Sequence, residues 1–385
     1  MAMGAAEAEA AIRAGIAALQ RGDAAEAKRL LGEVTERGSP LPPPFFLLAQ
    51  ACRHAGDEAG EAAALDKVLE AQPRNIGALI MRGDGHARAG DRRAAASFYR
   101  GAIQAAAAGA QVSPILASEL ARAEAAAAEI DGEFAAHLEN RLGAADGRVR
   151  DAVDILLGRK QVYLQQPTSF YFPGLPQIEY YEREGFPWLA PVEAAIPDMR
   201  AELQAALASD AGFVPYVESD PNRPPATHEL LGDPSWSAFH LWRKGDPVPE
   251  NAARCPATMA ALEAAPMPHI RGRSPMALFS VLRAGARIAP HNGLLNTRLI
   301  CHIPLIVPEG CALRVGNQVR AWEEGKALIF DDTIEHEAWN GSASIRVILL
   351  FEIWRPEIGE GERQALTALF EAITDFGSSE GVEEG

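Results

Sequence analysis

The sequence has few cysteines and no long apolar run, and these two absences narrow the possible classes of protein. Its four cysteines, Cys52, Cys255, Cys301 and Cys311, lie far apart and form no CxxC pair, so neither a zinc site nor a disulfide framework is indicated. No apolar run approaches the roughly 20 residues that cross a bilayer. The N-terminal segment is acidic and lacks the basic start and apolar stretch of a signal peptide. We therefore expect a cytoplasmic protein without a membrane span.

Positive charge is also scarce. The chain has 36 lysines and arginines against 52 aspartates and glutamates, a formal net charge of -16. Because nucleic-acid affinity comes largely from basic side chains that neutralise phosphates, we expect no nucleic-acid partner. The composition itself, with 48% hydrophobic and 23% charged residues, is typical of globular protein. A length of 385 residues exceeds what one hydrophobic core usually supports, so we expect two or three domains.

The first 110 residues contain an internal repeat. The dipeptides Gly22-Asp23, Gly56-Asp57 and Gly90-Asp91 are separated by 34 residues, twice. Each glycine follows one alanine-rich helical pattern and precedes another, as a turn with positive φ requires, and the period is that of tetratricopeptide units. The pattern predicts about three helix pairs over residues 1–110. An alanine-rich bundle with coincidental glycines is the alternative, and the doubled spacing disfavours it.

The repeats have two possible roles, and a helical bridge follows them. Stacked repeats form a curved surface that binds other chains, so one role is docking of a peptide or protein substrate or of another partner. The other role is a purely solubilising cap. Residues 111–160 continue the helical pattern, with Ser113 and Pro114 suited to the N-cap and the first helical position. They predict capping and linker helices.

A second domain is predicted over residues 161–360, because prolines and aromatic residues become frequent after Asp151. A helical pattern covers residues 192–209. Short apolar runs then make strand candidates, at residues 277–282, 297–306, 326–331 and 344–354. Short strands at this spacing favour a β-sandwich or jelly roll. Residues 361–385 predict a C-terminal helix and an acidic, disordered tail.

Three histidines fall within the strand-rich part: His291 in APHNG, His302 in LICHIPL and His336 in DDTIEHEAWN. A non-haem iron(II) oxygenase needs imidazole ligands and open metal positions for a keto acid and oxygen. It also needs a cation for the far carboxylate of the keto acid, and Arg346 in SIRVILLFEIW could form a bidentate pair with that group. On spacing alone, buried histidines bonded to backbone groups remain the commoner alternative.

The amino-acid sequence around these residues resembles that of a known family. Residues 279–358 look like the catalytic domain of aspartyl/asparaginyl β-hydroxylases, nearly without gaps, and the resemblance extends upstream through WSAFHLWRKG and YFPGLPQIEYYEREGFPWL to about residue 165. It implies a double-stranded β-helix, a jelly roll of the cupin kind. The expected fold class is therefore an α+β multidomain chain, with N-terminal tetratricopeptide-type repeats followed by this catalytic domain.

The resemblance also implies two cofactors, Fe(II) and 2-oxoglutarate, and a role for individual residues. His291 and His336 are expected to bind the iron. Ser280 and Arg346 are expected to hold the C5 carboxylate of 2-oxoglutarate, and His302 to assist at its C1 carboxylate. Catalysis would then depend on His291, His336 and Arg346.

The third metal position is where the family differs from most such oxygenases. Members carry glycine in place of a carboxylate ligand, and Gly293 stands there in this sequence. Asp331 and Asp332 are alternative donors because they precede His336. A turn at a strand end, or support for a water or an imidazole, are the other interpretations of the two aspartates.

Substrate contacts are less defined. Arg298 matches a family arginine that contacts the substrate carboxylate, with a surface salt bridge as the alternative. Ile300 replaces a second arginine of the animal enzyme and leaves the substrate open. Trp339, near His336, has no assigned role. Four other tryptophans are expected to be core or rim aromatics without cofactor contacts: Trp236, Trp242, Trp322 and Trp354.

The expected activity is that of a dioxygenase that uses O2, Fe(II) and 2-oxoglutarate to hydroxylate an unactivated carbon. By the resemblance, that carbon is the β-carbon of an aspartyl or asparaginyl residue in a peptide or protein. One alternative is a hydroxylase of a small molecule or a lipid acyl chain, although no basic amphipathic segment favours lipid. The other is a non-catalytic repeat scaffold with an inactive barrel.

Overall fold

The computed structural model describes residues 2–109, 112–143, 146–209, 211–218 and 229–376. The chain divides into two compact units, Met1–Leu157 and Gly158–Gly385. None of the described helices is long and apolar enough to cross a membrane. The predicted acidic tail, residues 377–385, lies outside the described residues.

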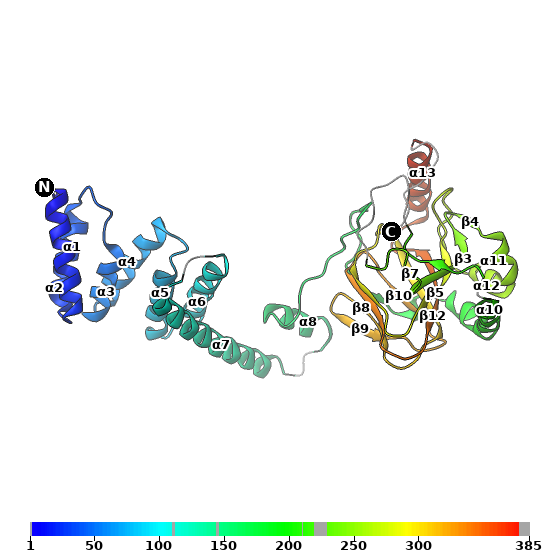
Figure 1. Ribbon diagram of the computed structural model, residues 1–385, viewed down its shortest axis with the longest axis horizontal. Coiled ribbons are helices and arrows are strands. Elements are labelled where there is room, and N and C mark those ends of the chain that lie inside the picture. The colour runs from blue at the N-terminus through cyan, green and yellow to red at the C-terminus, as the bar shows by residue number, and fades with distance from the viewer. Residues whose placement is uncertain (1, 110–111, 144–145, 210, 219–228, 377–385) are drawn as a thin grey trace. The chain divides into compact units, whose positions relative to one another are not determined.

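The first unit is helical throughout its described part (Figure 1). Its helices are α1 (Ala5–Gln20), α2 (Ala24–Arg37), α3 (Phe45–His54), α4 (Glu58–Ala71), α5 (Ile76–Arg88), α6 (Arg92–Ala107), α7 (Pro114–Leu142) and α8 (Gly147–Leu156). Small and branched apolar side chains fill the contacts between successive pairs. Ala18 of α1, Leu31 of α2 and Ala51 of α3, for example, belong to one buried cluster.

The 34-residue period corresponds to three helix pairs, α1/α2, α3/α4 and α5/α6. At each turn the glycine has positive φ, at +78° for Gly22, +72° for Gly56 and +79° for Gly90. The aspartate that follows caps the second helix of the pair, and each carboxylate accepts a backbone N–H three residues on, at 3.1 Å from Glu26, 2.9 Å from Gly60 and 3.0 Å from Ala94. The prediction of tetratricopeptide-type repeats is confirmed. Ser113 also caps α7 as predicted.

The second unit combines short helices with strands. Its helices are the 3-10 turn η1 (Arg183–Gly185) and α9 (Leu189–Ala194), α10 (Ile196–Ser209), α11 (Pro249–Arg254), α12 (Pro256–Leu262) and α13 (Glu360–Phe376). Its strands are β1 (Tyr180–Tyr181), β2 (Val214–Pro215), β3 (Trp236–Arg243), β4 (Asp246–Pro247), β5 (Ala277–Leu282), β6 (Arg287–His291), β7 (Arg298–Ile306), β8 (Cys311–Val315), β9 (Gln318–Ala321), β10 (Leu328–Phe330), β11 (His336–Asn340) and β12 (Arg346–Trp354).

These strands form two antiparallel sheets within the described residues. The 8-stranded sheet has the order β1-β10-β7-β12-β5-β3-β2, with β4 paired to β3, and the 4-stranded sheet has the order β6-β11-β8-β9. The four strand candidates correspond to β5, β7, β10 and β12, which are consecutive or near neighbours in the larger sheet. The predicted jelly roll, and with it the α+β multidomain fold class, is confirmed.

Alternation of side chains across the strands gives the second unit two cores. One face of the larger sheet packs against α9, α10 and α12 through residues such as Met199, Leu203 and Phe279. The other face meets the smaller sheet, where Leu278 and Ile348 of the larger sheet share a cluster with apolar residues of β6, β8 and β11. The candidate site is a pocket between the two sheets, lined by residues of both.

Candidate active site

The two histidines predicted to bind a metal lie side by side in the smaller sheet. His291 ends β6 and His336 begins β11, and the two residues are direct partners in the antiparallel register. Their ring centroids are 4.1 Å apart. The register shifts immediately after His336, and both side chains face the pocket between the sheets. Residues 45 positions apart in the chain are thus brought to one point.

Backbone carbonyls fix which nitrogen of each ring can bind a metal. The Nδ1 atom of His291 is 2.8 Å from the carbonyl oxygen of Ala289, and Nδ1 of His336 is 3.2 Å from that of Ile334. Since a carbonyl only accepts, Nδ1 carries the proton and Nε2 carries the lone pair, as in most metal-binding histidines. Burial, with repulsion from His291 added, holds the pKa of His336 well below its usual value. His336 is therefore in the neutral form that a metal requires.

The residue expected at the position of a third metal ligand is Gly293, which has no side chain. A side chain there would overlap the carboxylate of Asp332, which lies against Gly293 and faces the pocket. Asp331 does not line the pocket, because its carboxylate is bound by Arg355. Over the part of the chain that the structure describes, no group of three His, Cys, Asp or Glu side chains is arranged around one metal position. The arrangement is therefore a two-histidine site with Asp332 beside it.

Arg346 supplies a buried cation in the same pocket. It begins β12, is 1% exposed, and stacks on the Trp322 ring with 4.9 Å between guanidinium carbon and ring centre. Among the described residues, nothing forms a hydrogen bond with its Nε or Nη1. Burial lowers the pKa of Arg346 to about 10, so the side chain is still charged at neutral pH. A buried charge without a protein partner is costly, and it suits the binding of an anion.

His302 and Ser280 lie in the pocket with their hydrogen-bonding roles set by tryptophans. Nε1 of Trp322 donates to Nδ1 of His302 at 3.2 Å, so in the neutral ring Nε2 carries the proton and can donate it. Nε1 of Trp236 donates to Oγ of Ser280 at 3.0 Å, which leaves the hydroxyl hydrogen for another acceptor. Burial, reinforced by Arg346 and His336, holds the pKa of His302 well below its usual value.

Two of the tryptophans therefore have a larger role than the sequence suggested. Trp236 and Trp322 are buried, as expected, but they also line the pocket and orient Ser280, His302 and Arg346. The prediction that they are core or rim aromatics without cofactor contacts did not include this orienting role. Their positions in the chain gave no signal, because a buried tryptophan in a core and one at a site have the same local pattern.

Arg298 is buried and already paired. The arginine is 5% exposed and lines the pocket, which rules out the surface salt bridge. Its guanidinium pairs with Glu352, which is fully buried, and lies 3.6 Å from the carboxylate of Asp332. The sequence did not single out Glu352. Ile300, two residues along β7, also lines the pocket and makes this wall apolar.

These features define a helical-repeat protein whose second unit is a double-stranded β-helix with a histidine-lined pocket between its sheets. Residues 193–356 match the family described as aspartyl/asparaginyl beta-hydroxylase. The match includes both histidines, Ser280, Arg298 and Arg346. This part of the second unit is therefore similar to the aspartyl/asparaginyl beta-hydroxylase family, whose named relatives are hydroxylases.

Similar proteins of known name agree with this similarity. The mouse aspartyl/asparaginyl beta-hydroxylase is 33% identical over 250 residues, covering 62% of this chain and 32% of that protein. The ornithine lipid ester-linked acyl 2-hydroxylase of Rhizobium tropici is 36% identical over 179 residues, covering 46% of this chain and 60% of that protein. Human aspartate beta-hydroxylase domain-containing protein 2 is 32% identical over 216 residues, covering 54% and 55%. The chain thus spans about a third to three fifths of the length of these relatives.

Proposed function

We propose that the second unit is an iron(II)- and 2-oxoglutarate-dependent hydroxylase. The observation that carries the proposal is the pairing of His291 with His336 on neighbouring strands, in one pocket with the buried cation of Arg346. Two neutral imidazoles suit a divalent iron, and a guanidinium with unused N–H groups suits a carboxylate. The similarity to this family adds support, because the named relatives are hydroxylases.

Five residues of the pocket have a task in this proposal. His291 and His336 hold the metal through Nε2. Arg346 and the hydroxyl of Ser280 hold the far carboxylate of 2-oxoglutarate, and His302 donates from Nε2 toward its other end. When bound, Fe(II) and 2-oxoglutarate activate O2, so that one oxygen atom enters a C–H bond and the keto acid becomes succinate and CO2. The apolar walls exclude water from that chemistry.

The names of two relatives point to a common type of reacting carbon. The β-carbon of an aspartyl or asparaginyl residue is bonded to the side-chain carbonyl carbon, and carbon 2 of an ester-linked acyl chain is bonded to the ester carbonyl carbon. We infer that this site hydroxylates a carbon next to a carbonyl group, first of all in an aspartyl or asparaginyl residue. Arg298, on the pocket wall, would contact the carboxylate of the substrate.

A lipid acyl chain or another small molecule is the second candidate substrate. Ile300 makes the wall beside Arg298 aliphatic, and the acyl 2-hydroxylase is 36% identical to this chain. For a peptide substrate, we propose that the helical repeats dock the chain outside the pocket. We also predict a cytoplasmic location for the protein.

The experiment is turnover of labelled 2-oxoglutarate with Fe(II), ascorbate and oxygen, in the presence of a peptide pool or of lipid extract. The proposal expects release of labelled CO2, one succinate per keto acid, and a product heavier by one oxygen atom. A His336→Ala variant that retains the fold should release none. Equal CO2 release by both proteins would contradict the role of His336, and release by neither would contradict the proposal and favour a non-catalytic scaffold.

A further inference from the structure

A segment outside the family match contacts two turns, one next to His291 and one next to His336. We call residues 161–181 the covering segment, residues 292–297 the first turn, which follows His291, and residues 331–335 the second turn, which precedes His336. Backbone N–H groups of the covering segment bond both turns: Gln166 donates to the carbonyl of Thr333 at 2.7 Å and Thr168 to that of Gly293 at 3.0 Å. The matched region begins only at residue 193.

The side chain of Gln165 connects the two turns directly. Its Nε2 donates to Oδ2 of Asp331 in the second turn at 2.7 Å, and its Oε1 accepts from Nδ2 of Asn296 in the first turn at 3.0 Å. Gln165 is 7% exposed, and Asp331 and Asn296 are 0% exposed. Only an amide of this length both donates and accepts in this way. A carboxylate would set two negative charges together, and an apolar side chain would leave both partners unsatisfied.

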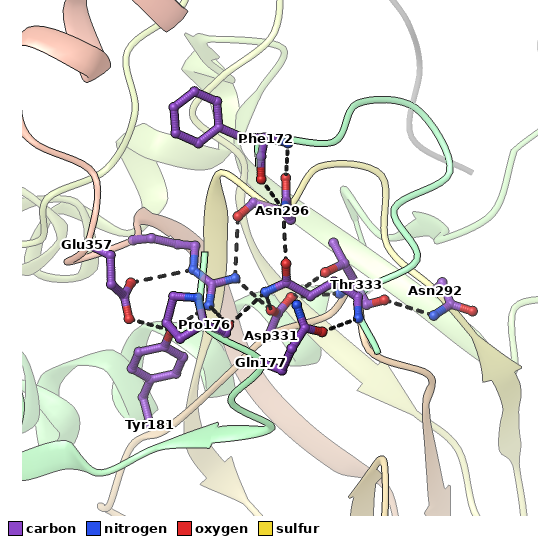
Figure 2. A network of polar contacts seen from close by, with 11 residues as sticks. Phe172, Pro176, Gln177, Tyr181, Asn292, Asn296, Asp331, Thr333 and Glu357 are labelled. Atoms are coloured by element: carbon purple, nitrogen blue, oxygen red, sulfur yellow. Dashed lines mark hydrogen bonds and ion pairs between the residues drawn. The ribbon is translucent and has the colours of Figure 1, made fainter. Parts of the chain in front are cut away.

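A buried ion pair completes the connection. Arg355 and Asp331, both 0% exposed, are joined at 2.6 Å. Asp331 also accepts from the backbone N–H and the hydroxyl of Thr333, at 3.0 and 2.6 Å, and the carbonyl of Thr333 accepts from Nδ2 of Asn292 at 2.9 Å. Figure 2 shows Asp331 and Thr333 between Pro176 of the covering segment and Asn292, the neighbour of His291. The bonds thus run from one turn to the other.

We propose that Gln165 is a positioning residue of the active site, which holds the first and second turns at the separation that lets His291 and His336 share one metal ion. The inference rests on the proposed function in one respect: the ion that the two histidines share is a divalent metal. The positioning itself is a property of the turns and can be measured without metal. Loss of such outer contacts typically weakens metal binding by about 10- to 100-fold.

The test compares Gln165→Met, which keeps the length of the side chain but removes its donor and acceptor, with Thr258→Val as a matched control. Thr258 is buried as well, at 0% exposed, and its replacement removes one bond, from its hydroxyl to Glu202 at 2.6 Å. It lies on α12, a helix that does not line the pocket. Titration with Mn²⁺ alone, followed by electron paramagnetic resonance, should show affinity about tenfold weaker for Gln165→Met and unchanged for Thr258→Val. Equal affinities for the two variants would overturn the proposal.

Exchanging the carboxylate and the amide between residues 331 and 165 tests the proposal even if Gln165→Met does not fold. Gln165→Glu and Asp331→Asn should each weaken Mn²⁺ binding, whereas the double variant restores one carboxylate and one amide and should recover much of the loss. No recovery in a folded double variant contradicts the proposal.

Amide hydrogen exchange separates this inference from the proposed function. Without metal, Gln165→Met should speed exchange at the N–H groups of Thr333 and Gly293, which bond within the second turn and between the turns, and Thr258→Val should not. Unchanged exchange overturns the positioning role. Absence of Mn²⁺ binding by the unsubstituted protein would instead contradict the proposed function, while the exchange result would still decide on positioning.

Discussion

At the scale of single residues, the site is recognisable because it contains a buried charge that lowers the stability of the folded protein. Arg346 is a buried cation whose Nε and Nη1 bond nothing among the described residues. Trp322 offers it an aromatic face and His302 lies close enough to feel its charge, and neither group balances that charge. Such a placement is expected at a functional site, and it supports the proposal that an anion binds to Arg346.

Replacing Arg346 by Met should therefore have opposite effects on binding and on stability. Affinity for 2-oxoglutarate should fall about 100-fold or more, since two charge-assisted hydrogen bonds are lost. The melting temperature without ligand should be unchanged or higher, because an unpaired buried charge is removed. Isothermal titration with Mn²⁺ present and differential scanning calorimetry measure the two quantities. Unchanged affinity for the keto acid would contradict the role given to Arg346.

Replacing Arg298 should, in contrast, reduce the stability of the folded protein. Its replacement by Met leaves the fully buried Glu352 without its cation and should lower the free energy of unfolding by about 3–5 kcal/mol. The control is Arg271→Met, which removes an exposed pair with Asp375 and should leave stability within error. Denaturant unfolding monitored by tryptophan fluorescence gives the comparison. Equal stabilities of the two variants would show that the pair with Glu352 is unimportant.

At the scale of elements, the sequence predicted what local patterns can encode. The glycine and aspartate of each repeat turn act on neighbours within three residues, so the 34-residue period, the caps and the helix pairs were accessible. The long buried strands β5, β7 and β12 were accessible for the same reason, since each is a continuous apolar run.

The strands β6 and β11, which carry His291 and His336, were not among the strand candidates. β6 contains Pro290, and β11 mixes His336 and Glu337 with apolar residues over a few positions. In the sheet, β11 pairs with β6 on one side and β8 on the other, and both partners are distant from it in the chain. The likeness to a family gave the residues of the site, whereas the contacts of Trp236, Trp322 and Gln165 became visible only in the folded chain.

The repeat caps make an element-scale prediction. Asp23→Ala removes the acceptor for the N–H of Glu26 and should lower the stability of the helical unit by about 1 kcal/mol. Asp23→Asn should not, because asparagine is an equally good N-cap. The midpoint of urea unfolding by far-ultraviolet circular dichroism measures both, and equal midpoints for the two variants would contradict the capping role.

At the scale of the whole molecule, each unit has its own buried core. The clusters of the first unit contain only residues before Leu157, and those of the second only residues after Gly158. All residues assigned to metal and keto-acid binding lie in the second unit. The described residues that line the pocket also belong to the second unit, and the contribution we propose for the repeats is to bring a substrate to it.

A chain that begins at Gly158 should bind Mn²⁺ and 2-oxoglutarate with affinities within about twofold of the full chain, since coupling between independent sites is small. Hydroxylation of a peptide substrate should then show a raised KM and an unchanged kcat. Titration calorimetry measures the first expectation and steady-state turnover the second. A large loss of keto-acid affinity would mean that the first unit supports the pocket.

The most direct test of the central claim is a crystal structure of the full chain, grown without oxygen, with Fe(II) and 2-oxoglutarate, using anomalous scattering at the iron edge. The account predicts one anomalous peak within bonding distance of Nε2 of both His291 and His336, and the far carboxylate of the keto acid on the guanidinium of Arg346. No peak between the two imidazoles, or a keto acid bound away from Arg346, would contradict it.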